Sequence, residues 1–321
     1  MSNLKRYNIY PISVDVNASL KTINFYLIQI GQSLMLIDAG VNNDDNKKAL
    51  HTVLQKNGFS LEDLTEIVLT HNHVDHVGLV NWISENRSIP VYAADEAIPR
   101  LKRDRDFLEM RLNFFATLYQ EMGCGETGDK QAAYLKKAIE KNSSKSIKPE
   151  VTPIGNKHKG FGIIEIPGHA PDQIALFDEE ERDLFAGDLL INHISSNALI
   201  EPDPSGRRLP TVSQHKKSLE TVRDLDVNRI YSGHGKVIEE PDELIHKRLS
   251  GIDRKAEKVM ESIREGLETG NKIAQAIYGK IYDSQFSLVM SEIIGHLDYL
   301  ENRQQITKEM KNGVWHYAVT R

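Results

Sequence analysis

The chain has a single cysteine, Cys124, among its 321 residues. One thiol cannot form a disulfide within the chain, and it cannot build a cluster of thiolates around a metal ion. Any metal site would therefore rest on imidazole and carboxylate groups, and twelve histidines make such a site feasible. Cys124 stands between two glycines and away from the motifs described below, so we assign it no catalytic role.

Long apolar runs are also missing. No stretch approaches the roughly eighteen apolar residues of a membrane span, and the first ten residues lack the charged-then-apolar pattern of a secretion signal. We therefore expect a cytoplasmic protein without a membrane partner. A net charge of -6 argues against an extended basic surface for nucleic acid.

Short strands and helices are predicted to alternate along much of the chain. The strand segments are residues 25–30, 34–37, 66–69, 162–166, 184–186 and 229–231. Apolar residues at helical spacing around Leu50 predict a helix after the second segment. His71, His169, Asp188 and His234 each come just after one of these strands. Because the loops of layered α/β folds gather at one edge, these four distant segments can converge on one site.

Between Pro99 and Pro149 the sequence becomes rich in charge, and its apolar residues follow helical spacing from Phe107 to Tyr119. This pattern predicts a helical insertion, residues 100–150, made of two helices. Such helices would pack against the parent domain, cover the active site or form a dimer contact. The sequence leaves these alternatives open, so a homodimer is one of them.

The C-terminal part is predicted to contain three helices and a hairpin. Helical sequence begins near Glu243 and recurs at 272–278 and 285–300, and a hairpin is expected around Asn312 and Gly313. Helix, helix, helix, hairpin is the outline of a winged helix, a module that often binds nucleic acid. Acidic residues on or beside its third helix would oppose phosphate, which favours a packing or dimerisation module. These residues are Glu292, Asp298 and Glu301.

The most informative stretch is Thr70 to Gly78, which reads THNHVDHVG. Four potential metal ligands lie within six positions: His71, His73, Asp75 and His76. In an extended segment the alternation of side chains places the first two on one side. Imidazole and carboxylate ligands suit zinc first, with iron or manganese as alternatives. Chance clustering is a poor explanation, because burying several imidazoles without a metal ion is costly.

This stretch resembles the HxHxDH signature of the metallo-β-lactamase superfamily. Three further turns resemble those of the same family: Pro167-Gly168-His169, Gly187-Asp188 and Gly233-His234-Gly235. Leu36 to Gly40 is similar to the family's early strand-and-turn motif, in which we expect Asp38 to fix the loop by accepting backbone hydrogen bonds. The resemblance covers about residues 20 to 236, and the tail to Arg321 resembles the winged-helix extension of the lactamase-beta-2-like branch.

The resemblance implies an α/β fold: a four-layer αββα sandwich with the helical insertion and a small C-terminal winged-helix-like domain. Residues 1–236 would form the catalytic domain and residues 237–321 the C-terminal domain. The family's site holds two divalent metal ions. The first would be bound by His71, His73 and His169, the second by Asp75, His76 and His234, and Asp188 would bridge them. Asp75 and Asp188 would also be the catalytic carboxylates around a metal-bound hydroxide.

The expected function is a metal-dependent hydrolase that acts on a small ester or thioester. An endoribonuclease acting on single-stranded RNA is one alternative, and a lactonase or glyoxalase-type hydrolase is another. Lactonases of the family often carry a tyrosine shortly after the bridging aspartate, where this chain has Leu189 to His193. His193 is a candidate for substrate binding. A non-catalytic binding module is disfavoured because every ligand position is filled.

Overall fold

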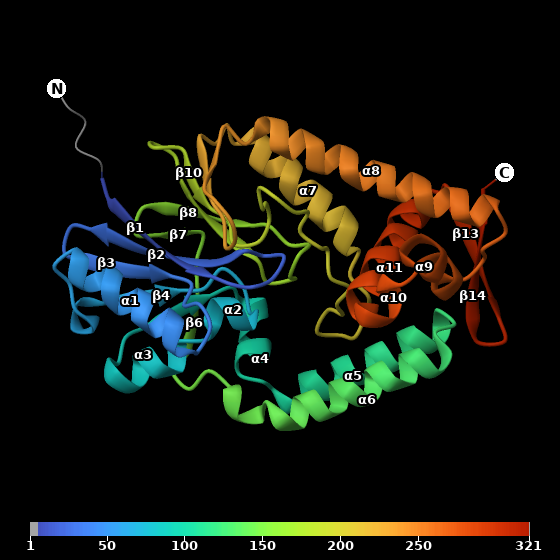
Figure 1. The fold of residues 1–321 in the computed structure, drawn as a ribbon, viewed down its shortest axis with the longest axis horizontal. Helices are drawn as coiled ribbons and strands as arrows, with labels where there is room; N and C mark the ends of the chain where they lie inside the picture. The colour runs from blue at the N-terminus through green and yellow to red at the C-terminus, as the bar shows by residue number, and fades with distance from the viewer. Residues whose placement is uncertain (1–5, 321) are drawn as a thin grey trace. The chain divides into compact units, whose positions relative to one another are not determined.

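The computed structural model describes residues 6–320. Residues 1–5 and Arg321 lie outside the described residues. The expectation about a secretion signal in the first ten residues therefore falls partly outside them. The chain forms two compact units (Figure 1). We call the first the sheet unit; its described residues are 6–102, 147–196 and 218–245. We call the second the helical unit; its described residues are 103–146, 197–217 and 246–320.

The sheet unit contains two six-stranded sheets. The first sheet has the order β1-β2-β3-β4-β5-β6. Its strands are β1 (Asn8–Asp15), β2 (Thr22–Ile30), β3 (Ser33–Ile37), β4 (Glu66–Val68), β5 (Val91–Ala93) and β6 (Val151–Pro153). Strands β1 to β3 are antiparallel, and β3 to β6 are parallel. The strands predicted at residues 25–30 and 34–37 are therefore confirmed as β2 and β3, which pair as an antiparallel hairpin.

The second sheet has the order β12-β11-β10-β9-β8-β7. Its strands are β7 (Lys157–His158), β8 (Phe161–Glu165), β9 (Ile174–Asp178), β10 (Asp183–Phe185), β11 (Arg229–Tyr231) and β12 (Ile238–Glu239). The strands predicted at 162–166, 184–186 and 229–231 correspond to β8, β10 and β11. Only β10 and β11 are parallel in this sheet, so the loops that follow both strands lie at the same edge.

Side chains of β2 and β3 alternate between two apolar layers, because successive residues of a strand point to opposite faces. Leu27 and Leu36 belong to the layer that also contains Leu50 of α1 (Asp44–Lys56). Ile28 and Met35 belong to a second layer, which joins the two sheets through aromatic residues of both. The expected mixed α/β fold, with two sheets flanked by helices, is thus confirmed.

The remaining helices of the sheet unit are short. They are α2 (Val74–Val77), α3 (Val80–Asn86) and α4 (Ile98–Leu101). Within the described residues, three single turns of 3₁₀-helix occur at Leu61–Asp63, Asp95–Ala97 and Ser143–Lys145, the last of them in the helical unit. The chain passes from one unit to the other within two long helices, α7 (Thr211–Asp224) and α8 (Asp242–Arg264).

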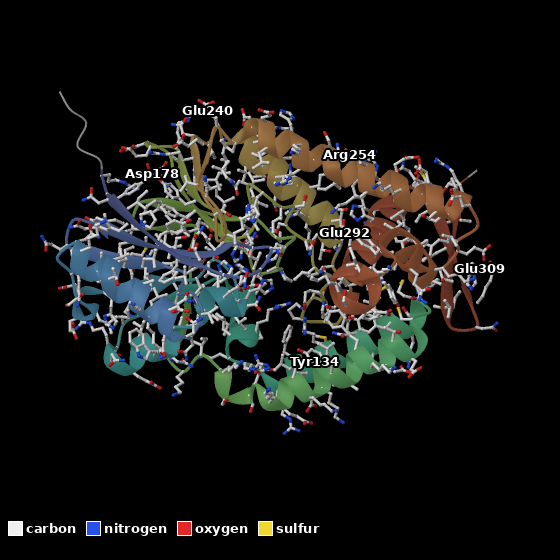
Figure 2. The ribbon with its side chains drawn as sticks, viewed as in Figure 1. Tyr134, Asp178, Glu240, Arg254, Glu292 and Glu309 are labelled. Carbon is white, nitrogen blue, oxygen red and sulfur yellow. The ribbon has the colours of Figure 1, made fainter. Side chains whose placement is uncertain are left out.

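The helical unit contains the predicted insertion as two helices. They are α5 (Arg105–Glu121) and α6 (Gly125–Lys141), whose Tyr134 is 64% exposed (Figure 2). The same unit includes α9 (Gly270–Tyr278), α10 (Ile281–Ser284), α11 (Phe286–Asn302) and the hairpin of β13 (Ile306–Lys311) and β14 (Val314–Val319). The predicted domain boundary at residue 236 stays a prediction; the boundary between units in this region falls after Ile245.

Helix α11 occupies the place of the expected recognition helix. Every residue from Val289 to Leu300 is buried. A helix that is buried on all sides belongs to a core, whereas a recognition helix needs an exposed face to enter a groove. The order of helices and hairpin agrees with the winged-helix outline, but that classification stays a prediction. Among the described residues, no helix is long and apolar enough to cross a membrane.

Gly78 directly follows α2 and lies against the backbone of the neighbouring loop. A Cβ atom on Gly78 would stand 2.4 Å from the Asn42 nitrogen and 2.6 Å from the Gly40 oxygen. We expect Gly78→Ala to lower the free energy of unfolding by about 1–3 kcal/mol, since backbone atoms must move to relieve the clash. Gly155→Ala is the matched control, because a Cβ there has no atom within 4 Å. Equal thermal stability of the two variants would contradict this account.

Candidate metal centre

The predicted ligands come from four segments of the sheet unit, three loops and one loop that continues into a short helix. His71 lies three residues beyond the end of β4, and His73 is the residue before α2. The short helix α2 then carries Asp75 and His76. His169 lies between β8 and β9, and the remaining two residues, Asp188 and His234, follow the parallel strands β10 and β11. The shared edge of these strands explains how segments distant in sequence meet.

Three histidines form one group. The His73 Nδ1 atom lies 3.0 Å from His71 Nε2 and 2.9 Å from His169 Nε2. All three nitrogens lie within 4.8 Å of one another. Two nitrogen ligands of a tetrahedral zinc ion, with bonds of about 2.0–2.1 Å, would be separated by about 3.3 Å. The observed spacing therefore fits a shared metal ion.

A second group contains Asp75, His76 and His234, whose ligand atoms also lie within 4.8 Å of one another. The His234 Nε2 atom is 3.5 Å from Asp75 Oδ2. Asp188 faces both groups: its Oδ2 atom is 3.5 Å from His169 Nε2 and 3.1 Å from His234 Nε2. Its other oxygen, Oδ1, is 3.4 Å from His76 Nε2. The sequence therefore identified seven side chains that the fold brings together.

Several inward-facing atoms of this cluster are buried and make no hydrogen bond of acceptable geometry. They are His76 Nε2, His234 Nε2 and Asp188 Oδ1. Buried polar atoms without partners are costly, and native proteins contain few of them. Here three such atoms belong to facing side chains, two imidazoles and one carboxylate. This donor set fits a bound divalent cation.

The opposite nitrogens of four histidines contact groups outside the cluster. The Nδ1 atom of His71 lies 3.1 Å from Thr70 Oγ1, and the Nδ1 atom of His76 lies 2.8 Å from Asp38 Oδ2. In the other two rings the partners are the Ser196 hydroxyl, 3.1 Å from His169, and the Thr22 carbonyl, 2.7 Å from His234. Such partners hold the rings so that Nε2 faces the cluster, as they do around metal ions.

Asp38 contacts His76 directly and is linked to His71 through Thr70. Its carboxylate accepts hydrogen bonds from the Thr70 backbone nitrogen, at 2.8 Å, and from the Thr70 hydroxyl. The same carboxylate contacts His76. The expectation that Asp38 accepts backbone hydrogen bonds is confirmed. The sequence did not reveal that Asp38 also orients a ring of the cluster.

Burial and charge set the protonation of the cluster. Burial, together with the imidazoles of His76 and His73, holds the pKa of His71 well below its ordinary value. The ring is therefore neutral at pH 7, which is the form that binds metal ions. Burial alone would raise the pKa of Asp188, but the facing imidazoles of His76 and His234 lower it well below its usual range. Asp188 is therefore an ionised carboxylate.

A partly buried hydrogen bond that sequence reasoning missed supports the ligand loop. Asn72, between the first two histidines, donates a hydrogen bond of 2.5 Å to Asp172. Burial raises the pKa of Asp172 to about 6, although Arg100 opposes that shift. The sequence shows an acidic residue, Asp172, three positions after His169. It does not indicate that this residue contacts Asn72, one hundred positions away.

His193, the candidate for substrate binding, lies beside the loop of His234. Its Nδ1 atom is 2.8 Å from Asn192 Oδ1, and its Nε2 atom is 2.8 Å from the Ser19 carbonyl. A Cβ atom on Gly235 would stand 2.9 Å from the His193 ring. These contacts fix the ring next to the cluster. A role in substrate binding stays a prediction.

The two-sheet fold and the imidazole–carboxylate cluster are those of a metallo-hydrolase. Residues 19–234 match the family model for the metallo-beta-lactamase superfamily, which is more than half of the chain. The chain belongs to this superfamily. A solved structure with the same fold is a metallo-beta-lactamase family protein from Thermus thermophilus, with a TM-score of 0.78 and 22% identity. That match covers 97% of this chain and 98% of the other.

Curated relatives span most of the chain. "Probable metallo-hydrolase YqjP" of Bacillus subtilis is 30% identical over 304 residues, 94% of each protein. "Beta-lactamase-like protein 2 homolog" of Caenorhabditis elegans is 28% identical over 256 residues, 77% of this chain and 68% of the relative. "Atrochrysone carboxyl ACP thioesterase" of Aspergillus fumigatus is 19% identical over 314 residues, 93% of this chain and 82% of the relative. The predicted likeness to the lactamase-beta-2-like branch is confirmed.

Asp38→Asn tests how the outer contacts support metal binding. The amide is nearly the same size as the carboxylate and tolerates the left-handed backbone at this position, where φ is 60°. It loses the negative charge that holds His76, so we expect the affinity for zinc to fall about 10–100-fold. Competition with a chromogenic chelator measures this affinity. Asp44→Asn is the control, because Asp44 is fully exposed, and this variant should bind zinc like the wild type. An unchanged affinity for zinc in Asp38→Asn would refute the role assigned to Asp38.

Proposed function

We propose that the protein is a hydrolase with a binuclear metal centre that acts on a small ester or thioester. The observation that carries this proposal is the cluster of facing imidazole and carboxylate atoms that are buried without hydrogen-bond partners. In this proposal His71, His73 and His169 hold the first metal ion. Asp75, His76 and His234 hold the second, and Asp188 bridges the two.

The position of Asp188 supports the bridging role. One oxygen faces His76, and the other lies within 3.5 Å of both His169 and His234. When bound, two divalent cations supply Lewis acidity and a water molecule of lowered pKa. Asp75 and Asp188 offset only part of that positive charge, so the centre stays suited to an anionic transition state. Zinc suits this donor set first, with iron or manganese as alternatives.

Three observations support a small ester or thioester as the substrate. The net charge of -6 and the buried helix α11 disfavour a nucleic-acid surface. The Aspergillus relative is named as a thioesterase and is similar over 93% of this chain. Endoribonuclease, lactonase and glyoxalase-type activities are the alternatives that a substrate panel must separate. The oligomeric state, the cytoplasmic location and the contact of His193 with substrate stay predictions.

Metal analysis of the purified protein tests the centre itself. We expect two equivalents of metal per chain in the wild type and a large loss of metal in Asp188→Ala, because that variant removes the ligand shared by both ions. His51→Ala is the matched control, since His51 is exposed and lies outside the cluster. Full metal content in Asp188→Ala would contradict the bridging role.

A hydrolysis panel tests the reaction. It contains an aryl ester, an acyl thioester, a lactone, the glutathione thioester of lactate and single-stranded RNA, each incubated with wild type, Asp188→Ala and His51→Ala. We expect turnover of the ester or thioester that disappears with chelator and in Asp188→Ala. Turnover of RNA alone would replace the proposed substrate class but keep the metal centre. No turnover by the metal-loaded wild type would overturn the hydrolase proposal.

A further inference from the structure

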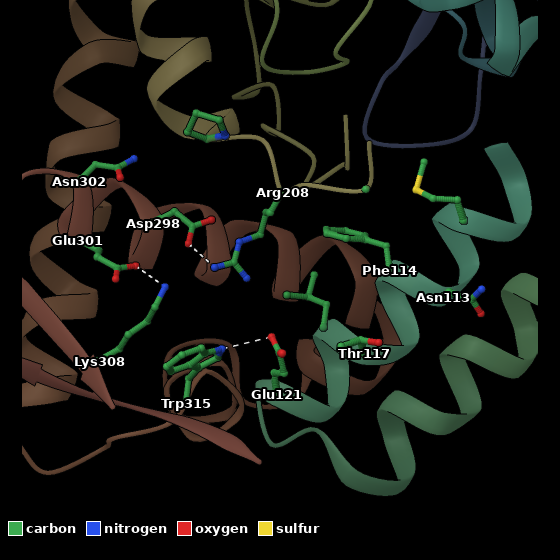
Figure 3. Close-up of a pocket in the computed structure, with 14 residues that line it drawn as sticks. Asn113, Phe114, Thr117, Glu121, Arg208, Asp298, Glu301, Asn302, Lys308 and Trp315 are labelled. Carbon is green, nitrogen blue, oxygen red and sulfur yellow. Dashed lines mark hydrogen bonds and ion pairs between the residues drawn. The ribbon is translucent and has the colours of Figure 1, made fainter. Parts of the chain in front are cut away.

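Two cavities of the helical unit differ in how their charged side chains are paired. The first has a volume of about 760 Å³ and is lined by α5, α11 and the β13–β14 hairpin. Its cations are both held by carboxylates: Arg208 lies 2.8 Å from Asp298, and Lys308 lies 2.7 Å from Glu301 (Figure 3). This cavity therefore offers no unpaired cation to a ligand.

The second cavity, which we call the α5–α6 cavity, has a volume of about 700 Å³. Leu108 and Leu112 of α5 and Ile139 of α6 supply its apolar wall, and each of them is only half-buried. Two neutral polar residues, Asn113 and Ser143, also line it. Five charged residues complete the lining: Arg103, Arg105, Lys136, Glu109 and Glu140. Three cations and two carboxylates give a net charge of +1, on a chain whose total is -6. The cavity is thus both apolar and locally positive.

Arg103 is the partly buried cation of this cavity that has no partner among the described residues; Lys136 also forms no ion pair there, but it is exposed. Within residues 6–320 the Arg103 side chain forms no ion pair or hydrogen bond, and its Nε atom is buried without a partner. Burial and the nearby Arg111 lower its pKa from the ordinary value. The neighbouring arginines differ. The Nε atom of Arg105 is 2.8 Å from Glu109, and Arg111 binds Glu201.

An unmatched cation of this kind favours an anionic ligand. A guanidinium group is planar and presents parallel N–H donors that match the two oxygens of a carboxylate. A carboxylate carries a single negative charge and would balance the net +1 of the cavity. A phosphate monoester carries a charge of about -1.5 to -2 at pH 7 and would overcompensate it. The leucine and isoleucine wall can cover an apolar chain, and the volume is typical of small-molecule sites.

We propose that the α5–α6 cavity binds a small organic monoanion, a carboxylate on a short apolar chain, with Arg103 as its charge partner. The site lies entirely within the helical unit, and the proposal does not depend on the hydrolase reaction or on the metal centre.

Isothermal titration calorimetry of the full metal-loaded chain with sodium octanoate tests this site. The neutral analogue 1-octanol tests the charge requirement, and acetate tests the apolar wall. We expect saturable binding of octanoate that is at least about tenfold tighter than the binding of either analogue, because only octanoate satisfies both the cation and the wall. Equal binding of octanoate and octanol, or no saturable binding of octanoate, would overturn the proposal without any variant.

Three variants locate the binding. Arg103→Gln should weaken octanoate binding about tenfold or more, whereas Arg103→Lys keeps the positive charge and should recover part of it. Arg105→Gln is the matched control, since its arginine is exposed and already paired with Glu109; we expect a change below about twofold. Thermal melting of each variant verifies folding.

Asp188→Ala separates this site from the metal centre, which could also attract a carboxylate. Octanoate binding that persists in Asp188→Ala and weakens in Arg103→Gln supports the α5–α6 cavity. Binding that is lost in Asp188→Ala and unchanged in Arg103→Gln assigns the carboxylate to the metal centre and overturns the proposal.

Discussion

The candidate metal centre depends on imidazole and carboxylate atoms that are buried and face one another at one edge of the sheet unit. Such burial is unfavourable unless a cation compensates it. The fold supports the cluster with contacts on its outer side, where hydroxyl, carbonyl and carboxylate groups occupy the second nitrogen of four rings. Each of these rings therefore has one nitrogen committed to the protein and one directed at the cluster. That division of roles is what a metal centre requires.

The sequence predicted the cluster well because its signals are local. The four potential ligands of residues 71–76 lie within six positions, and the other three each follow a short strand that the structure confirms as β8, β10 or β11. Residue type and strand position together were enough to place all seven side chains at one edge. The outer contacts were harder to predict. The Thr22 carbonyl that meets His234 is a backbone atom 212 positions away, and no residue type signals it.

The grouping of segments into units was also beyond the sequence. Periodicity predicted α5 and α6 as helices, but a helical period shows only that one face is apolar and does not identify what that face contacts. The structure groups residues 103–146 with the C-terminal segment that begins at His246. The unpaired state of Arg103 is likewise a tertiary property. In the sequence Arg103 and Arg105 look alike, and only the folded chain shows that, among residues 6–320, one has a carboxylate partner and the other has none.

Helix α11 shows how a conclusion can hold while its reason changes. In the sequence, Glu292, Asp298 and Glu301 disfavour a nucleic-acid recognition helix because their charges oppose phosphate. In the structure each carboxylate contacts a cation of the same unit: Lys255, Arg208 and Lys308 respectively. Paired carboxylates repel phosphate less than free ones, so charge is the weaker argument. Burial is the stronger one, since a helix enclosed from Val289 to Leu300 has no face to offer a groove unless it leaves its own core.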